Sequence, residues 1–313
     1  MARVAVVLGA GGARGYAHLG AVAELRARGH QVVAVSGTSM GALVGGLVAA
    51  GREEDFAGWA LSLTQPRVIR LLDPVWAGGG AVSLNRLFRT LEEMVGEVLI
   101  EDLEIFYTAV ATDLEARREV WFQRGPLIPA IRASIALPGL FTPATIGGRV
   151  LVDGGLLNPL PLDPTAAATV DFTFAVSLQG PRAPHEPTSP ARGRSVRPAE
   201  WASDLRRRFG RPDPLEPPEA AAQPPSVQAP EAPAAADAPD GAERPDVRTS
   251  EVVSQSFDAM QALITRYRLA AMPPDVLVTV PLSAARTLDF HRAAELIDLG
   301  RTLAAAALDD AER

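Results

Sequence analysis

The sequence predicts an α/β fold with a mainly parallel central sheet, because short apolar runs alternate with helical patterns along most of the chain. The first three elements illustrate this: an apolar run at residues 3–8, a helical pattern at 13–28 and a second apolar run at 31–35. Their order and spacing are typical of a β-α-β unit. The two runs consist mainly of valine, alanine and leucine, as expected for buried strands.

The remaining predicted elements continue this alternation on both sides of a long proline-rich segment. Before that segment we expect helices at 40–50, 53–63, 84–98 and 126–135, and strands at 105–111, 119–122 and 172–178. Gly147-Gly148 predicts a hairpin turn between strands at 144–146 and 149–152. After the segment we expect a helix at 252–269, a strand at 275–280 and a helix at 290–308.

The proline-rich segment differs in composition from its flanks. Residues 181–250 carry 15 of the 27 prolines, and such a segment buries too little apolar surface to offset its ordering entropy. We therefore expect one α/β domain made of residues 1–180 and 251–313, with 181–250 as a mostly disordered insertion. Inside it, residues 201–209 place three apolar side chains at helical spacing. Two interpretations stay open: a helical turn resting on the domain, or a mobile lid or membrane-touching helix.

Residue usage excludes several kinds of chemistry. The 313 residues include no cysteine, which excludes disulfides, thiolate catalysis and cysteine-ligated zinc. All 30 basic residues are arginine, so Schiff-base lysines, Walker A loops and serine–lysine dyads are excluded as well. A net charge of -7 leaves no basic surplus to displace counterions from phosphates, which argues against nucleic-acid binding.

A candidate nucleophile lies just after the second predicted strand. The segment from Gly37 to Gly41 has the G-x-S-x-G form of a nucleophile elbow, in which a serine occupies a sharp strand-to-helix turn. The two glycines let neighbouring segments approach the strained backbone closely. Ser39 would then stand at the N-terminus of the helix at 40–50, where unpaired N–H groups favour developing negative charge.

The glycine-rich loop after the first strand allows two interpretations. A dinucleotide site would need a glycine where Arg14 stands and an acidic residue after the second strand, where the chain has Val35-Ser36. An oxyanion hole fits better, with the N–H groups of Gly11 and Gly12 facing the oxygen of a tetrahedral intermediate formed at Ser39. Arg14 would then hold the loop or meet an anionic head group.

An activated serine needs a base, and the sequence favours a carboxylate over histidine. The four histidines lie in helices, in a turn away from the elbow or in the insertion, where catalysis is poorly supported: His18, His30, His185 and His291. Asp153 follows an apolar run and precedes two glycines, so its side chain emerges at a strand end where the backbone can be approached closely. Asp113 also ends a predicted strand and is the rival candidate.

Three motifs, in this order along the chain, resemble the patatin-like phospholipases, specifically the short bacterial members: Gly11–Gly15, Gly37–Gly41 and Asp153–Gly155. The resemblance extends over about residues 3–179 and 252–307 and leaves the insertion unmatched. It implies a three-layer α/β/α sandwich and a Ser–Asp dyad.

The resemblance also implies a role for each matching residue. Ser39 corresponds to the nucleophile and Asp153 to the proton acceptor. Gly11, Gly12 and Arg14 correspond to the oxyanion loop. The remaining motif positions are Ala10, Gly15, Gly37, Gly41, Gly154 and Gly155. Ala10 stands where the family usually has the first glycine of this loop, and a positive φ there would cost on the order of 1 kcal/mol.

The function that the resemblance implies is hydrolysis of lipid acyl esters, of the phospholipase A, lysophospholipase or esterase type, without metal or cofactor. Two alternatives stay open. One is a lipid transacylase. The other is a regulatory or scaffold protein with a weakly active core, whose insertion binds a protein partner that the sequence does not identify. The N-terminus lacks the length and cleavage site of a secretory signal, so we expect a cytoplasmic protein, with peripheral contact to a membrane as one of its interactions.

Overall fold

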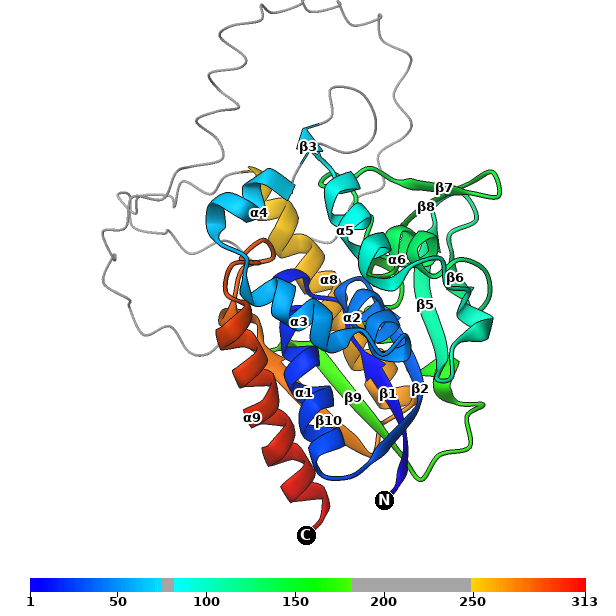
Figure 1. Cartoon of the computed structure of the whole chain (residues 1–313), viewed down its shortest axis with the longest axis vertical. Helices are drawn as coiled ribbons and strands as arrows, with labels where there is room; N and C mark the ends of the chain where they lie inside the picture. The colour runs from blue at the N-terminus through cyan, green and yellow to red at the C-terminus, as the bar shows by residue number, and fades with distance from the viewer. Residues whose placement is uncertain (72, 75–81, 182–248) are drawn as a thin grey trace, which may run out of the picture. The chain divides into compact units, whose positions relative to one another are not determined.

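The computed structural model describes residues 1–71, 73–74, 82–181 and 249–313, and nearly all of the predicted insertion lies outside them (Figure 1). Residues 201–209, whose apolar side chains have helical spacing in the sequence, also lie outside the described residues. The described residues belong to one compact unit. That unit is built on an eight-stranded sheet with helices on both faces, so the predicted α/β/α arrangement is confirmed.

The sheet has a parallel centre and an antiparallel end. Its strand order is β10-β9-β1-β2-β5-β8-β7, and β6 pairs with β5. The five strands from β10 to β5 are mutually parallel, while β6, β7 and β8 run antiparallel to their neighbours. The bounds are β1 Arg3–Leu8, β2 Gln31–Thr38, β5 Phe106–Asp113, β6 Arg118–Phe122, β7 Ala144–Ile146, β8 Arg149–Asp153, β9 Phe172–Gly180 and β10 Val276–Pro281; β3 Asp73–Pro74 and β4 Val82–Ser83 form a separate pair.

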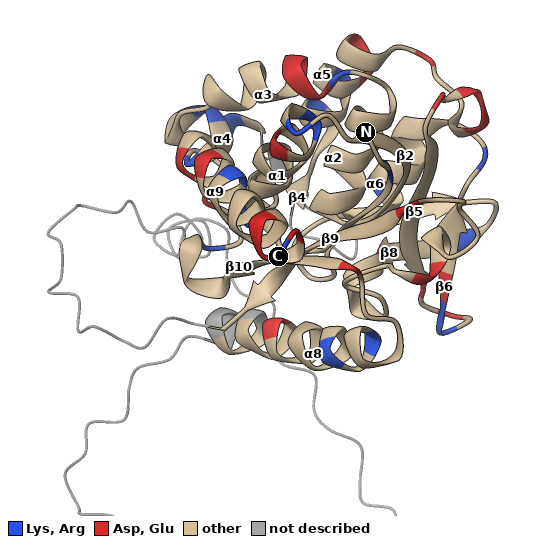
Figure 2. Cartoon of the chain, turned by 90° about the horizontal axis from the view of Figure 1, so that it is seen from below, with Lys and Arg blue, Asp and Glu red and all other residues tan. Residues whose placement is uncertain are grey.

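The helices divide unequally between the two faces of the sheet. Figure 2 shows α8 on one side and α1, α2, α3, α5, α6 and α9 on the other. The α-helices are α1 Tyr16–Ala27, α2 Met40–Ala49, α3 Glu53–Leu61, α4 Gln65–Leu71, α5 Asn85–Val95, α6 Leu127–Ser134, α8 Thr249–Ala271 and α9 Ala293–Ala311. Short 3-10 turns are η1 Gly12–Gly15, η2 Ile100–Asp102, η3 Gly154–Leu156, η4 Asp163–Thr165 and η5 Leu282–Ala284.

Alternate residues of β1 supply the two halves of the core. Val4, Val6 and Leu8 pack into the large cluster under α1, α2 and α9. Val7 points to the other face, where a small cluster includes Leu160, Leu162 and Ala175, with Leu269 of α8 packed against it. The face under α8 is therefore the thinner part of the core, and polar contacts hold much of that helix.

Helices α1 and α9 pack backbone against backbone beside each other (Figure 1). A Cβ on Gly20 would overlap the carbonyl oxygen of Ile297, and one on Gly300 would overlap that of Ala17. Together with the pairing of β10 to β9, this contact joins the segment after residue 248 to the N-terminal part of the same unit.

Several predicted boundaries are wrong for local reasons. The helix predicted from residue 13 begins at Tyr16, because Gly12 has φ +57° and the chain first forms a 3-10 turn. The helix predicted to residue 98 ends at Val95, because Gly96 has φ +76°. The second strand extends beyond the predicted residue 35 to Thr38. Helix α4 was not anticipated.

Candidate active site

Ser39 occupies a strained strand-to-helix turn. Strand β2 ends at Thr38 and α2 begins at Met40, and Ser39 between them has φ 57° and ψ -123°. A non-glycine residue in this region costs on the order of 1–3 kcal/mol and persists only where its surroundings hold it. A Cβ on Gly41 would overlap the carbonyl oxygen of Leu8, so the elbow requires glycine there. Ser39 is half-buried.

The sheet register brings Asp153 to the same place. Strand β2 runs along β5 as far as Thr38, which is opposite Val110. Strand β8 runs antiparallel to β5 and ends with Asp153 opposite Ala111, the next residue. Because β6 pairs along the other edge of β5, β2 and β8 share one edge and their ends meet there. The residue after β2 is Ser39, so the two side chains emerge side by side.

The Ser39 hydroxyl donates a hydrogen bond of 2.5 Å to Oδ2 of Asp153. Oδ1 of the same carboxylate accepts the N–H of Gly155 at 2.7 Å. Asp153 is only 2% exposed, and this burial raises its pKa to about 6, although the bonds from Ser39 and Gly155 oppose the rise. Asp153 is thus ionised at neutral pH and is a stronger base than an ordinary aspartate.

The rival Asp113 has a structural role. Its Oδ1 accepts the N–H of Ala116 at 3.0 Å, which closes the turn after β5. In the sheet it stands opposite Leu151, two positions from the pair that carries Asp153. The pairing register of β5 and β8 decides which aspartate lies beside Ser39, and the sequence does not reveal that register.

Backbone hydrogen bonds fix the glycine-rich loop on either side of Gly11 and Gly12. The N–H groups of Gly9, Ala10 and Ala13 donate to the carbonyls of Val176, Pro159 and Thr287 respectively. Across the part of the chain that is described, the N–H groups of Gly11 and Gly12 have no protein acceptor. Two neighbouring free donors on a fixed loop are what an oxyanion hole needs.

Arg14 braces this loop with its side chain. It is 3% exposed, and its guanidinium donates to Asp258 of α8 and to the carbonyl of Leu282, both at 3.3 Å. Of the two roles that the sequence left open, holding the loop is the one that these contacts favour. Gly15 follows it and packs directly against the side chain of Met40, beside the elbow.

Ala10 carries no positive φ. Among the described residues, the non-glycine residues with positive φ are Ser39 and Arg117. The strain considered for an alanine at this loop position is therefore absent. The Ala10 side chain faces the loop after β8, where Gly155 has no Cβ to oppose it; Gly154, beside it, packs on the carbonyl of Val110.

Two of the described histidines, His18 and His30, have packing roles. His18 is fully buried with Nε2 2.8 Å from the carbonyl oxygen of Gly9, and burial lowers its pKa to about 4, so it is neutral and donates to the glycine loop. His30 packs edge-on against Phe172. His291 is exposed and lies before α9, not inside a helix as predicted. His185 lies outside the described residues.

Sequence reasoning missed Ser134, which supports the elbow. Its Oγ accepts the N–H of Ser39 at 2.9 Å and donates to the carbonyl of Val110 at 2.6 Å. It also missed α8 as part of the site. Gln261 of this helix hydrogen-bonds Gln179, which in turn donates to the carbonyl of Ala10. The available signal was the resemblance of residues 3–179 to the family, which gives no role to a single serine.

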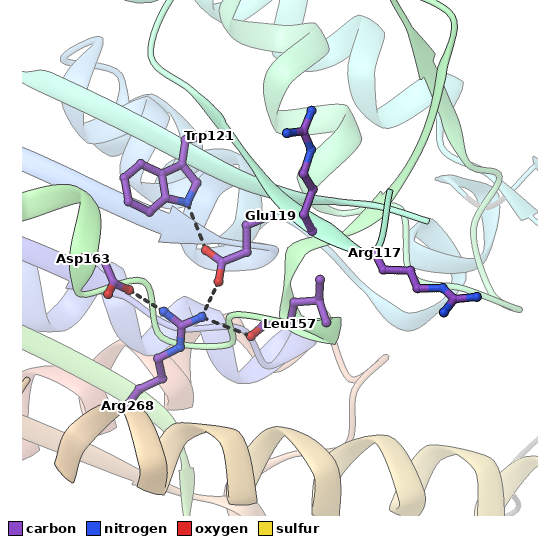
Figure 3. A pocket seen from close by; sticks show the side chains of 7 residues that line it. Arg117, Glu119, Trp121, Leu157, Asp163 and Arg268 are labelled. Atoms are coloured by element: carbon purple, nitrogen blue, oxygen red, sulfur yellow. Dashed lines mark hydrogen bonds and ion pairs between the residues drawn. The ribbon is translucent and has the colours of Figure 1, made fainter. Parts of the chain in front are cut away.

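A polar pocket lies beside the loop after Asp153. Figure 3 shows Arg268 of α8 between the carboxylates of Glu119 and Asp163, with Nη2 3.5 Å from the carbonyl oxygen of Leu157. Glu119 also accepts the indole N–H of Trp121 at 2.9 Å. Across residues 1–71, 82–181 and 249–313, no group of acidic and histidine side chains is arranged to hold a metal ion. Within the same ranges no helix combines the length and apolarity that a membrane span requires.

These features place the protein in the class of α/β proteins built around a nucleophile elbow. Comparison with known proteins gives the family: residues 6–166 match the family model described as patatin-like phospholipase. The chain belongs to the patatin-like phospholipase family, which confirms the resemblance seen in its motifs.

The similar proteins include one that matches over nearly its whole length and one that matches over a small part of its length. An uncharacterized NTE family protein of Mycobacterium tuberculosis is 45% identical, over 98% of this chain and 91% of its own length. Lysophospholipase NTE1 of Saccharomyces cerevisiae is 32% identical over 56% of this chain and 11% of its own length. Among solved structures, VipD from Legionella pneumophila covers 98% of this chain and 66% of its own, with 12% identity and a TM-score of 0.45.

Proposed function

We propose that this protein is a serine acyl hydrolase that cleaves ester bonds of lipids with Ser39 as nucleophile and Asp153 as base. The observation that carries the proposal is the 2.5 Å hydrogen bond from the hydroxyl of Ser39 to the buried carboxylate of Asp153. Membership in the patatin-like phospholipase family and similarity to a yeast lysophospholipase support lipids as the substrate class.

The first half of the reaction forms an acyl-enzyme. Asp153 takes the hydroxyl proton while Ser39 Oγ attacks the ester carbonyl, and a tetrahedral intermediate forms with a negative oxygen. Asp153 then gives the proton to the departing alcohol, which leaves the acyl group esterified to Ser39. Since a carboxylate is a weak base towards a hydroxyl, proton transfer is concerted with attack.

The second half regenerates the enzyme. Asp153 accepts a proton from water, whose oxygen attacks the acyl carbonyl, and the collapse of the second tetrahedral intermediate releases the fatty acid and returns the proton to Ser39. The free N–H groups of Gly11 and Gly12 are the proposed donors to both negative oxygens. Each such donor lowers the barrier by about 3 kcal/mol.

The dyad is tested with purified Ser39→Ala and Asp153→Asn, and with Ser62→Ala as an exposed-serine control. We expect the first two to lose hydrolysis of a short-chain p-nitrophenyl ester by at least 1,000-fold, and the control to retain it. A fluorophosphonate should label the parent and the control, but not Ser39→Ala. Wild-type activity in Ser39→Ala would refute the proposal. Mass analysis of products with an added alcohol acceptor separates hydrolysis from acyl transfer.

A further inference from the structure

Asn158 is bonded through its backbone to the residues beside both members of the proposed dyad. Its carbonyl oxygen accepts the hydroxyl of Thr38, the residue before Ser39, at 2.8 Å. Its N–H donates to the carbonyl of Gly154, the residue after Asp153, also at 2.8 Å. Asn158 therefore contacts the strand that carries the nucleophile and the loop that carries the base, and its position helps to set the distance between them.

The residue after Asn158 connects the same segment to the glycine-rich loop. The carbonyl of Pro159 accepts the N–H of Ala10 at 2.8 Å. Gly11 and Gly12, whose N–H groups are the proposed oxyanion donors, follow directly. A proline has a fixed φ and restricts the backbone of the residue before it. Asn158 and Pro159 therefore form a stiff segment, and the nucleophile strand, the base loop and the glycine-rich loop are all bonded to it.

Strand β2 contributes two donors to this segment from one face. Ser36 and Thr38 are two positions apart, so their side chains lie on the same side of the strand. Both are fully buried, and they donate to the carbonyls of Pro161 and Asn158 at 2.5 and 2.8 Å. Residues 158–161 thus lie along the end of β2, and a shift of this segment would also displace the elbow.

The side chain of Asn158 anchors the segment to the sheet. It is fully buried, and its Nδ2 donates to Oε2 of Glu119 at 2.8 Å. Glu119 lies on β6 opposite Thr112 of β5. Its Oε2 also accepts the indole N–H of Trp121, and its Oε1 is paired with Arg268 (Figure 3). The sheet register and these two further donors hold the carboxylate in place, so it offers Asn158 a fixed acceptor.

We propose that Asn158 and Glu119 are positioning residues of the dyad, and that their hydrogen bond holds Ser39 and Asp153 at the distance that proton transfer requires. This inference deepens the proposed function and rests on it. The side chain of Asn158 bonds Glu119, so it acts through the backbone of residue 158 and not on the reacting atoms. Misplacing reacting groups by about 1 Å can cost on the order of 100-fold in rate.

The test compares Asn158→Leu, Glu119→Ala and the double variant in the full chain. Leucine keeps the branched shape of asparagine and leaves the backbone of residue 158 unchanged, so it removes the side-chain donor alone. In Glu119→Ala, Arg268 keeps its pairing with Asp163. Trp121→Phe is the matched control, because it removes another donor to the same Oε2 and leaves the bond from Asn158 in place. Hydrolysis of a soluble short-chain ester and unfolding in urea are measured for each protein.

We expect each single variant to lower kcat roughly 10- to 100-fold, with KM changed by less than about twofold. The double variant should lose no more than the worse single variant, because both substitutions break the same bond. The acidic limb of kcat/KM should move to higher pH, since the hydrogen bond from Ser39 lowers the pKa of Asp153 and a longer distance weakens that bond. The control should keep the kcat, the KM and the pH profile of the parent.

An unchanged kcat in folded Glu119→Ala would overturn the inference, and so would losses that multiply in the double variant. A purely structural role would lower the free energy of unfolding and leave the pH profile in place, which would overturn it as well. If Asn158→Leu does not fold, the comparison of Glu119→Ala with Trp121→Phe decides. An inactive parent would refute the hydrolase and this inference together, whereas an active parent with unchanged variants would refute this inference alone.

Discussion

Replacing Asp153 with asparagine should stabilise the protein at neutral pH while abolishing activity. Burial raises the pKa of Asp153 from 3.8 to about 6, so the folded state prefers the neutral carboxyl. Its contribution to stability is complete below pH 3.8 and is lost as the pH rises through about 6. At 1.36 kcal/mol per pKa unit, the loss above pH 7 amounts to about 3 kcal/mol. Asparagine keeps the acceptor for Gly155 without this loss.

The assay compares the free energy of unfolding of the parent and Asp153→Asn in urea, followed by tryptophan fluorescence, at pH 5 and pH 8. Linkage predicts that the advantage of asparagine grows by about 1.4 kcal/mol between these two values. Other titrating groups affect the parent and the variant equally, so their effects cancel when the two free energies of unfolding are subtracted. Any pH-independent preference for asparagine cancels when the advantage at pH 5 is subtracted from that at pH 8. An equal advantage at both pH values would show that Asp153 is not held at a raised pKa.

Three further outcomes follow from the same geometry. The kcat/KM for a soluble ester should fall about tenfold per pH unit below about pH 6, because Asp153 becomes protonated; a flat profile down to pH 5 would contradict its role as base. Ser134→Ala removes the acceptor of the Ser39 N–H and should lower kcat about tenfold with little change in KM; a change in KM alone would argue against a positioning role. Gly20→Ala should lower the free energy of unfolding by at least about 2 kcal/mol through overlap with α9, whereas Gly58→Ala, in open space on α3, should raise it by about 0.5–1 kcal/mol, as urea melts would measure.

The alternating elements could be predicted because each carries its own local signal. Strand β1 has the bounds expected from its apolar run. The extension of β2 to Thr38 could not be predicted, because its polar residues are satisfied by distant carbonyls. Ser36 and Thr38 donate to Pro161 and Asn158 at 2.5 and 2.8 Å. Such partners are set by the tertiary fold, which the strand sequence alone does not contain.

The candidate site was partly predictable for the same reason. The elbow at Ser39 and the glycine loop depend on short motifs, so their positions could be found from sequence. The choice between Asp153 and Asp113 depends on which residue of β8 lies opposite Ala111 of β5. Register across an antiparallel pair is a long-range property. Ser134 was missed because its importance lies in two hydrogen bonds to residues far away in the chain.

The polar inner side of α8 has a structural cause in the loops that the helix covers. The loops of the candidate site lie beyond the ends of strands, where backbone carbonyls have no sheet partner and need other donors. Gln179, held by Gln261, donates to the carbonyl of Ala10. The guanidinium of Arg268 is directed at the carbonyl oxygen of Leu157. A helix that covers such loops needs a polar inner side.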